Sequence, residues 1–318
     1  MTRTDTAMKQ GHTEPGCSIA FLGMDGVGKS TLAQELERRL TQRGRPVALL
    51  SRREYLKKQP DGFVGATITG LYEGSLRTLY GFAGLGDGGT LGERFPPPPA
   101  DLMARDFEML LDGAEITSND PRALTASMLC EIAGHMMFRT AVVLPAVAQG
   151  QVVIEDTHGI KMVVKQYLLA TSLLAPGDPL QARLDAVLEL ALELLRPADG
   201  ALSLAVVVHT EPEIAYERRV RQKGRVGGME HYGPVGRAAD RDSYLDLQSS
   251  SQKIFERIGD RWDCLRADLT DAQDQEQLTS TRRAVDDILA AVERLRDGRG
   301  HGATTGSPVA PTTEGVNQ

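Results

Sequence analysis

The chain has 318 residues, of which 41% are hydrophobic and 25% charged, and its formal net charge is −7. This is ordinary globular composition, long enough for one large α/β domain or two small ones with a real core. The acidic balance excludes a general attraction to nucleic acid or to an anionic membrane surface. Any positively charged site must therefore be a local cluster.

The cysteines and the apolar runs bear on the compartment. Cys17, Cys130 and Cys264 are far apart in the sequence and form no CxxC pair. This pattern argues against a disulfide framework or a cysteine-based zinc site and favours a reduced cytoplasmic setting. The N-terminus lacks a signal-peptide pattern, and no apolar run approaches the ~20 residues of a membrane span. We expect a soluble, cytoplasmic protein that has no membrane partner.

Both ends of the chain are rich in small and polar residues. Residues 1–16 and 298–318 contain few large apolar side chains, so neither can offset its ordering entropy by burial. We expect both tails to be disordered and the folded domain to span 17–297.

The folded part begins with an apolar run that is followed by a glycine-rich loop and a helical pattern. The predicted buried strands read "SIAFLG", "PVALLS", "QVVIED", "LSLAVVVHT" and, more weakly, "CLRADL". Helical periodicity is present from Leu32 to Leu40, in 122–148 and 160–175, and from Leu184 to Leu195. Alternation of this kind predicts a parallel sheet flanked by helices.

Residues 60–121 differ from the rest of the chain. Their stretch "GFAGLGDGGTLGERFPPPPADL" has too much Gly and Pro for continuous regular structure. We expect an insertion or flap, which is either a solvated connector or a functional lid.

A phosphate-binding motif lies between the first strand and the first helix. Gly23, Gly28, Lys29 and Ser30 satisfy GxxxxGK[ST] in this context. Such a loop aims backbone N–H groups at phosphate oxygens, and the following helix adds its positive dipole end. Lys29 is expected to be exposed to the β and γ phosphates of ATP, and the Ser30 hydroxyl to ligate Mg²⁺.

A second metal-binding carboxylate is expected after "QVVIED". Asp156 falls at the carboxyl end of this strand, where ligands collect in open α/β sheets. The alternative interpretation is that Asp156 caps the next helix.

A basic cluster lies in "EPEIAYERRVRQKGRVGGME". Arg218 and Arg221 share a helical face, and Arg225 follows in a glycine-containing loop. An arginine-bearing lid suits phosphoryl transfer, because guanidinium groups stabilise charge on the equatorial oxygens. The alternatives are a solvated basic face and a nucleic-acid patch, although the acidic chain makes nucleic acid a poor candidate partner.

Together these segments resemble the thymidylate kinase family of nucleoside monophosphate kinases. The resemblance covers about two thirds of the chain and is carried by "FLGMDGVGKST", "LLSRRE", "LPAVAQGQVVIED", the arginine-rich segment and "CLRAD". It implies that Asp25 binds a sugar hydroxyl of the acceptor and that Arg53 lies near the acceptor phosphate. Arg53 and Glu54 correspond to the family's Arg-Glu pair, so Glu54 is also expected to bind the substrate. Because position 26 is Gly rather than Arg, the resemblance implies a catalytic arginine from the lid. The family's members are usually homodimers.

The chain departs from this family on the acceptor side. Asp156 is followed by Thr157 and His158, where the family has Arg and an aromatic residue, and His135 stands at another family arginine. A neutral Thr cannot grip two phosphate oxygens as a guanidinium fork does. The residues expected to bind ATP, the phosphoryl donor, therefore match the family. Those expected to bind the phosphate of the acceptor differ from it.

We predict a P-loop kinase that uses ATP and Mg²⁺ to phosphorylate a pyrimidine nucleotide or a close relative. A rival is a kinase for a nucleoside or another hydroxylated small molecule, with Glu54 or Asp156 as general base. A rival of another class is a nucleotide-binding regulatory or scaffold protein without transfer chemistry. The predicted nucleotide-binding residues are Gly23, Asp25, Gly26, Gly28, Lys29, Ser30 and Thr31.

Overall fold

The computed structural model describes residues 16–58, 62–96, 111, 113–197, 202–270 and 274–300. Its centre is a five-stranded parallel sheet in the order β2-β5-β1-β6-β7. All five strands coincide with the predicted apolar runs, and the central strand β1 is buried along its whole length. The strands are β1 (Cys17–Leu22), β2 (Val47–Leu50), β5 (Val152–Glu155), β6 (Leu202–His209) and β7 (Leu265–Asp268).

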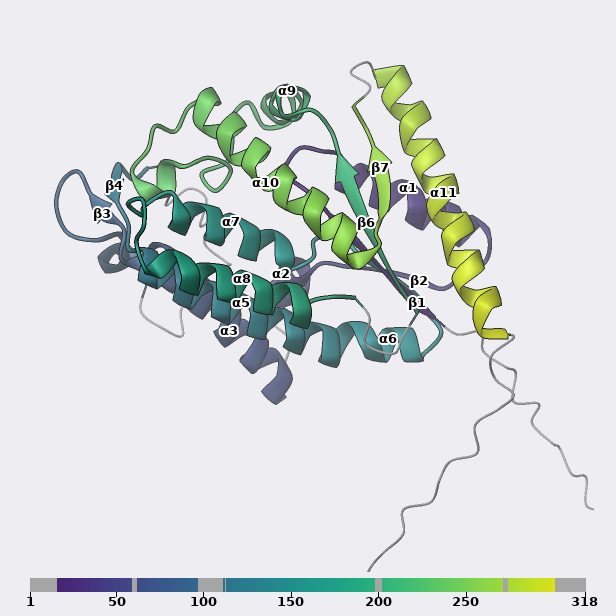
Figure 1. Ribbon diagram of the computed structural model, residues 1–318. Helices are drawn as coiled ribbons and strands as arrows, with labels where there is room; N and C mark the ends of the chain where they lie inside the picture. The colour runs from purple at the N-terminus through teal and green to yellow at the C-terminus, as the bar shows by residue number, and fades with distance from the viewer. Residues whose placement is uncertain are drawn as a thin grey trace, which may run out of the picture.

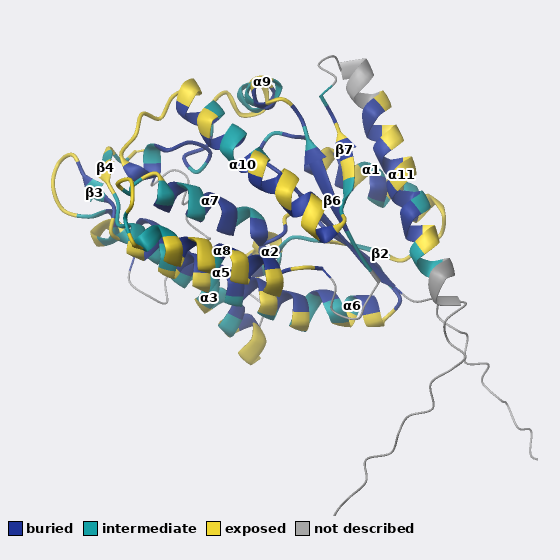
Figure 2. Ribbon diagram, viewed as in Figure 1, coloured by how far each residue is buried: buried dark blue, intermediate teal, exposed yellow. Residues whose placement is uncertain are grey.

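Helices cover both faces of the sheet, which confirms the α/β class (Figure 1). On one side lie α1 (Lys29–Gln42) and α11 (Asp274–Gly300). On the other side α10 (Arg241–Trp262) packs on β6, with α5 (Pro121–Phe138), α7 (Ile160–Thr171) and α8 (Leu180–Leu194) beyond it. The inner faces of these helices are buried and their outer faces exposed, so the core lies between sheet and helices (Figure 2).

Shorter elements complete the described chain. They are α2 (Arg52–Lys57), α6 (Leu144–Ala148), α9 (Pro212–Lys223), the hairpin strands β3 (Gly84–Leu85) and β4 (Ile116–Ser118), the 3₁₀ turns η1 (Leu91–Arg94) and η3 (Gly233–Val235), and the π-helical turn η2 (Arg139–Val143). Because the five sheet strands are parallel, the loops that leave their carboxyl ends meet at one edge of the sheet.

The expectation for residues 60–121 is wrong over its first part. Residues Gly62–Gly81 form the 20-residue helix α3, which packs along α5. Its buried residues Ile68, Leu76 and Leu79 supply a helical apolar face, and this packing outweighs the low helix propensity of its glycines. Residues 97–110, which contain all but the first proline of the proline run, lie outside the described residues.

The predicted tails also need one correction. Helix α11 continues to Gly300, so the first three residues of the expected C-terminal tail are helical. Residues 1–15 and 301–318 lie outside the described residues.

One helical stretch, Pro121–Ala148, is long and apolar enough to cross a membrane by length and composition. Half of its most apolar window is buried inside the molecule, where α5 packs against α3 and α7. The charged side chains of Glu131 and Arg139 within this stretch are buried and ion-paired. These features are those of a core helix.

Candidate active site

The loop from Gly23 to Ser30 joins β1 to α1 at the carboxyl edge of the sheet. Gly23 has φ +137°, and a Cβ there would lie 2.5 Å from the Val208 carbonyl oxygen. Gly28 is the N-terminal cap of α1 in the left-handed conformation, with φ +97°. Side chains rarely adopt these angles, so the turn depends on glycine at both positions of the predicted motif.

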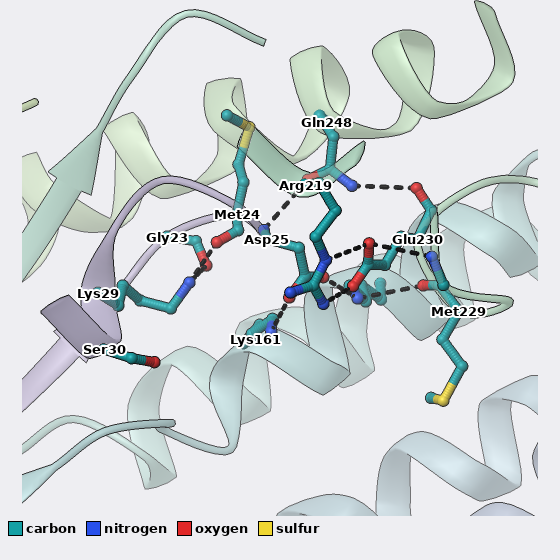
Figure 3. A network of polar contacts seen from close by, with 12 residues as sticks. Gly23, Met24, Asp25, Lys29, Ser30, Lys161, Arg219, Met229, Glu230 and Gln248 are labelled. Atoms are coloured by element: carbon teal, nitrogen blue, oxygen red, sulfur yellow. Dashed lines mark hydrogen bonds and ion pairs between the residues drawn. The ribbon is translucent and has the colours of Figure 1, made fainter. Parts of the chain in front are cut away.

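The Lys29 side chain is folded back on this loop. Only 8% of the residue is exposed, and its ammonium group donates to the Gly23 carbonyl at 3.0 Å and to the Met24 carbonyl (Figure 3). The expectation of an exposed lysine is therefore wrong for this conformation. Burial, together with the nearby Lys161 ammonium, lowers the pKa of Lys29 to about 7.

Ser30 lies beside Asp156, as the motif predicts for residues that share a cation. The Ser30 hydroxyl donates to Asp156 Oδ1 at 3.1 Å, across the gap between α1 and the end of the neighbouring strand β5. Ser30 is exposed and Asp156 is half-buried. A hydroxyl and a carboxylate oxygen in this arrangement are suitable ligands for a hard cation such as Mg²⁺.

A cavity of about 550 Å³ opens over this loop. Gly26, Gly28, Lys29, Ser30 and Thr31 line one side of it, and α7 and α9 supply further side chains. The described lining residues include eight basic and five acidic side chains. The cavity thus has three more basic than acidic side chains, in a chain whose net charge is −7. Such a cavity favours an anionic ligand.

Asp25 is held by two lysines of α7. Its carboxylate forms ion pairs with Lys161 and Lys165, and only 7% of the residue is exposed. Burial by itself raises the pKa of Asp25, but Lys161, Lys165 and Lys29 together hold it well below its usual range. The carboxylate is therefore ionised, and it points into the basic part of the cavity (Figure 3).

The arginines of α9 occupy different surroundings. Arg218 is buried, lines the cavity and donates to the Leu269 carbonyl at 2.7 Å. Arg221 and Arg225 are exposed and do not belong to the described lining. Instead Arg219, which was not predicted, lines the cavity and forms a two-pronged ion pair with Glu230 (Figure 3).

The Arg-Glu pair predicted from "LLSRRE" lies on α2, at the cavity wall. Arg53 and Glu54 are both exposed lining residues, and Glu54 accepts from Lys57 at 2.7 Å. The preceding residue, Arg52, is buried and forms an ion pair with Glu131 of α5. Its guanidinium also lies 4.7 Å from the centre of the Tyr72 ring. Arg52 is therefore already paired, whereas Arg53 faces the cavity.

This buried ion pair yields a stability prediction. Glu131→Met removes the carboxylate partner of Arg52, a residue of which only 8% is exposed. We expect the free energy of unfolding to fall by about 3–5 kcal/mol, because an uncompensated buried charge remains. Denaturant unfolding measures this. Glu54→Met, at an exposed pair, serves as the control with an unchanged midpoint, and a loss below about 1 kcal/mol for Glu131→Met contradicts the prediction.

The two altered acceptor-side positions differ in exposure. Thr157 is exposed and lines the cavity, whereas His135 is buried below it against His158, with ring centres 4.1 Å apart. Burial lowers the pKa of both histidines well below the usual range, and Arg139 and Arg52 act in the same direction. Both imidazoles are therefore neutral at neutral pH.

Sequence reasoning missed Lys161, Lys165 and Arg219 of the lining. Lys161 and Lys165 are four residues apart, so they share one helical face, and their helix follows directly after Asp156. That spacing was a usable signal. Arg219 belongs to the predicted basic cluster, but its pairing with Glu230, eleven residues away across a loop, gave no local signal.

No model of a known protein family matches the chain, and comparison with curated proteins finds no match either.

Proposed function

We propose that this chain is a P-loop phosphotransferase that transfers the γ-phosphoryl group of ATP to a nucleotide-like acceptor. One observation carries the proposal. The glycine-dependent loop between β1 and α1 brings Lys29 and Ser30 to a basic cavity, and Ser30 contacts Asp156 from the neighbouring strand at 3.1 Å. A nucleoside triphosphate carries the charge that this excess of positive groups favours.

The side chains divide into donor and acceptor sides. The backbone N–H groups at the start of α1 would hold the β and γ phosphates, and Lys29 would leave the Gly23 and Met24 carbonyls to bind them. Ser30 and Asp156 would hold Mg²⁺, which when bound neutralises charge on the phosphate oxygens. The acceptor oxygen then attacks the γ phosphorus, and the bond to the ADP oxygen breaks.

The acceptor side consists of Asp25, Lys161 and Lys165 from below and Arg53 from α2. These cations support an acceptor that itself carries negative charge. Asp25 remains ionised between the lysines and is placed to accept a hydrogen bond from an acceptor hydroxyl. A pyrimidine nucleotide or close relative combines both features, and the resemblance to thymidylate kinases favours the same class. A cytoplasmic location and a homodimer belong to this proposal.

The test is incubation of the full chain with Mg²⁺-ATP and a panel of nucleosides, nucleoside monophosphates and sugar-like acceptors. We expect mass detection to find one acceptor heavier by a single phosphoryl group. Product from an unphosphorylated acceptor alone would favour the hydroxyl kinase. ATP binding without product from any acceptor would favour the regulatory protein.

The pKa of Lys29 predicts proton uptake when ATP binds. In the free protein this pKa is about 7, so at pH 8 most molecules hold a neutral amine. A bound triphosphate raises the pKa, and close to one proton is therefore taken up at pH 8 but none at pH 6. Titration calorimetry at pH 8 in two buffers of different ionisation enthalpy measures this. Equal heats in both buffers would contradict it, and Lys29→Met is expected to abolish the difference.

The lid residues give a further prediction. Arg225 lies in the loop after α9 and is exposed, so it acts only if this loop closes over the cavity. Arg225→Ala, and likewise Arg221→Ala, is expected to lower kcat about tenfold or more and to leave ATP affinity nearly unchanged, because the guanidinium is needed in the transition state. Steady-state kinetics and ATP titration separate the two quantities.

The control for the lid is Arg237→Ala, at an exposed ion pair with Asp246 outside the cavity lining, which should retain kcat. Equal losses in ATP affinity and turnover for Arg225→Ala would mean that this residue only anchors phosphate.

A further inference from the structure

Below the cavity, three buried side chains from separate elements converge. His135 comes from α5, Glu155 is the last residue of β5, and His158 lies in the turn before α7. At most 1% of each residue is exposed. One ligand atom from each lies within 4.8 Å of the others. This buried cluster of two imidazoles and a carboxylate has no role in the proposed phosphoryl transfer.

The two imidazoles leave polar atoms without a partner. The Nε2 atoms of His135 and His158 are fully buried, and no hydrogen-bond partner for either is found among the described residues. Leaving a buried polar atom without a partner costs free energy, so each one calls for a water, an ion or another explanation. A neutral imidazole nitrogen is a common metal ligand.

The carboxylate is oriented toward these nitrogens. Arg139 donates to Glu155 Oε1, while Glu155 Oε2 lies 3.9 Å from His135 Nε2. Ligating carboxylates in metal sites are commonly fixed by a second hydrogen bond of this kind. Two histidine nitrogens and one carboxylate oxygen are also a familiar ligand set for zinc, in which the fourth position stays open.

We propose that His135, Glu155 and His158 bind one Zn²⁺ ion. With bonds of about 2.0–2.1 Å, tetrahedral ligand atoms lie roughly 3.3 Å apart, so the 3.9 Å separation and the others within 4.8 Å must contract when the ion binds. The site is distinct from the proposed Mg²⁺ ligands Ser30 and Asp156, and its imidazole nitrogens suit zinc rather than magnesium. The inference is independent of the phosphotransferase proposal.

Charge and tautomer set two conditions on this site. Arg139 is paired with Glu155 and Arg52 with Glu131, so the surrounding charges balance before an ion enters. Because Arg139 already balances Glu155, the charge of a bound ion is not offset by these residues, and the open fourth position favours an anionic ligand. His158 borders the cavity from which this ligand can enter. The Ile160 N–H donates to His158 Nδ1 at 3.4 Å. When His158 binds the ion through Nε2, the ring proton moves to Nδ1, and this long hydrogen bond is lost.

The test uses the full chain with a histidine-free tag, expressed with added zinc and purified without chelator. Elemental analysis is expected to find about one zinc per chain after gel filtration. His135→Gln and His158→Gln should each lower this content about tenfold or more, because each removes one of three ligands. His209→Gln, at the end of β6 and outside the cluster, is the matched control and should retain zinc.

If either variant fails to fold, the spectrum of the wild-type protein with Co²⁺ decides. Intense visible absorption of a low-coordinate Co²⁺ ion that zinc abolishes supports the site. Absence of zinc together with a featureless cobalt spectrum would mean that only water fills the cluster and would overturn the proposal. Retention of zinc by both folded variants would likewise overturn it, because the metal would then be bound elsewhere.

Discussion

Lys29→Ala is expected to lower phosphoryl transfer about 10²- to 10³-fold, which is the loss typical of removing one preorganised charge from a transition state. The side chain begins in contact with the Gly23 and Met24 carbonyls, inside the loop that would hold the phosphates. From there its ammonium can reach a bound triphosphate by rotation of its own side chain. No other lysine of the described lining belongs to this loop.

The same substitution should leave the fold intact. The reason is not that the Lys29 side chain is exposed, since it is buried. Because the pKa of Lys29 is lowered to about 7, only about half of the molecules carry its charge at neutral pH in the free protein. Loss of its two hydrogen bonds is thus offset by relief of burial and of repulsion from Lys161. Thermal unfolding should show a similar midpoint for wild type and variant. Lys57→Ala, on exposed α2, is the matched control for activity.

A folded Lys29→Ala protein with near-normal transfer to any acceptor would show that the loop from Gly23 to Ser30 is not the phosphate-binding loop. A protein that loses both activity and its folding transition would instead point to a structural role for this lysine.

The second large effect concerns dTMP. If the acceptor phosphate were held as in the thymidylate kinases, guanidinium groups would be needed where this chain has Thr157 and His135. Two lost charge-assisted hydrogen bonds cost about 3–6 kcal/mol, which corresponds to roughly 10²- to 10⁴-fold in kcat/KM. We therefore expect weak activity on dTMP and better activity on a modified nucleotide or a hydroxyl acceptor.

The structure narrows the ways in which this loss could be compensated. Arg52 is committed to Glu131, and Arg94 is paired with Asp87 outside the cavity lining. Arg53 remains as an exposed lining cation near the acceptor side, whereas Lys161 and Lys165 share the Asp25 carboxylate. From residues 60–121, the described lining includes Tyr72 of α3.

A gain-of-function variant tests the acceptor prediction directly. Thr157 is exposed in the cavity lining, so an arginine there has room to reach a phosphate. Thr157→Arg is expected to raise kcat/KM for dTMP relative to the best wild-type acceptor, and Thr157→Gln serves as an uncharged control. Efficient and selective phosphorylation of dTMP by the unmodified protein would overturn the prediction.

Local sequence patterns predicted the strands of the central sheet and the loop between β1 and α1. Each of the five apolar runs became a strand. The continuous apolar segments of β1 and β5 are fully buried, as a strand covered on both faces requires, whereas the edge strands β2 and β7 are partly exposed. Gly44, with φ +72°, follows the end of α1, where a glycine in the left-handed conformation commonly ends a helix. The Ser30–Asp156 contact followed from the same logic, since both residues were assigned to the carboxyl edge of the sheet.

Other features depended on tertiary contacts that no local pattern encodes. The glycines of α3 predicted an irregular segment, yet packing of Ile68 and Leu76 along α5 stabilises a helix. The buried position of Lys29 results from the surrounding lysines and backbone carbonyls. Similarly, Arg219 and Glu230 meet only because the loop after α9 folds back over the cavity.

The central claim is transfer of a phosphoryl group from ATP to an acceptor, and isotopic label measures it most directly. The full chain is incubated with Mg²⁺ and ATP labelled at the γ phosphate, with and without each acceptor. The account predicts that label appears covalently in one acceptor, that ATP turnover depends on that acceptor, and that Lys29→Ala loses both. Label found only in inorganic phosphate, at the same rate with or without any acceptor, would contradict it.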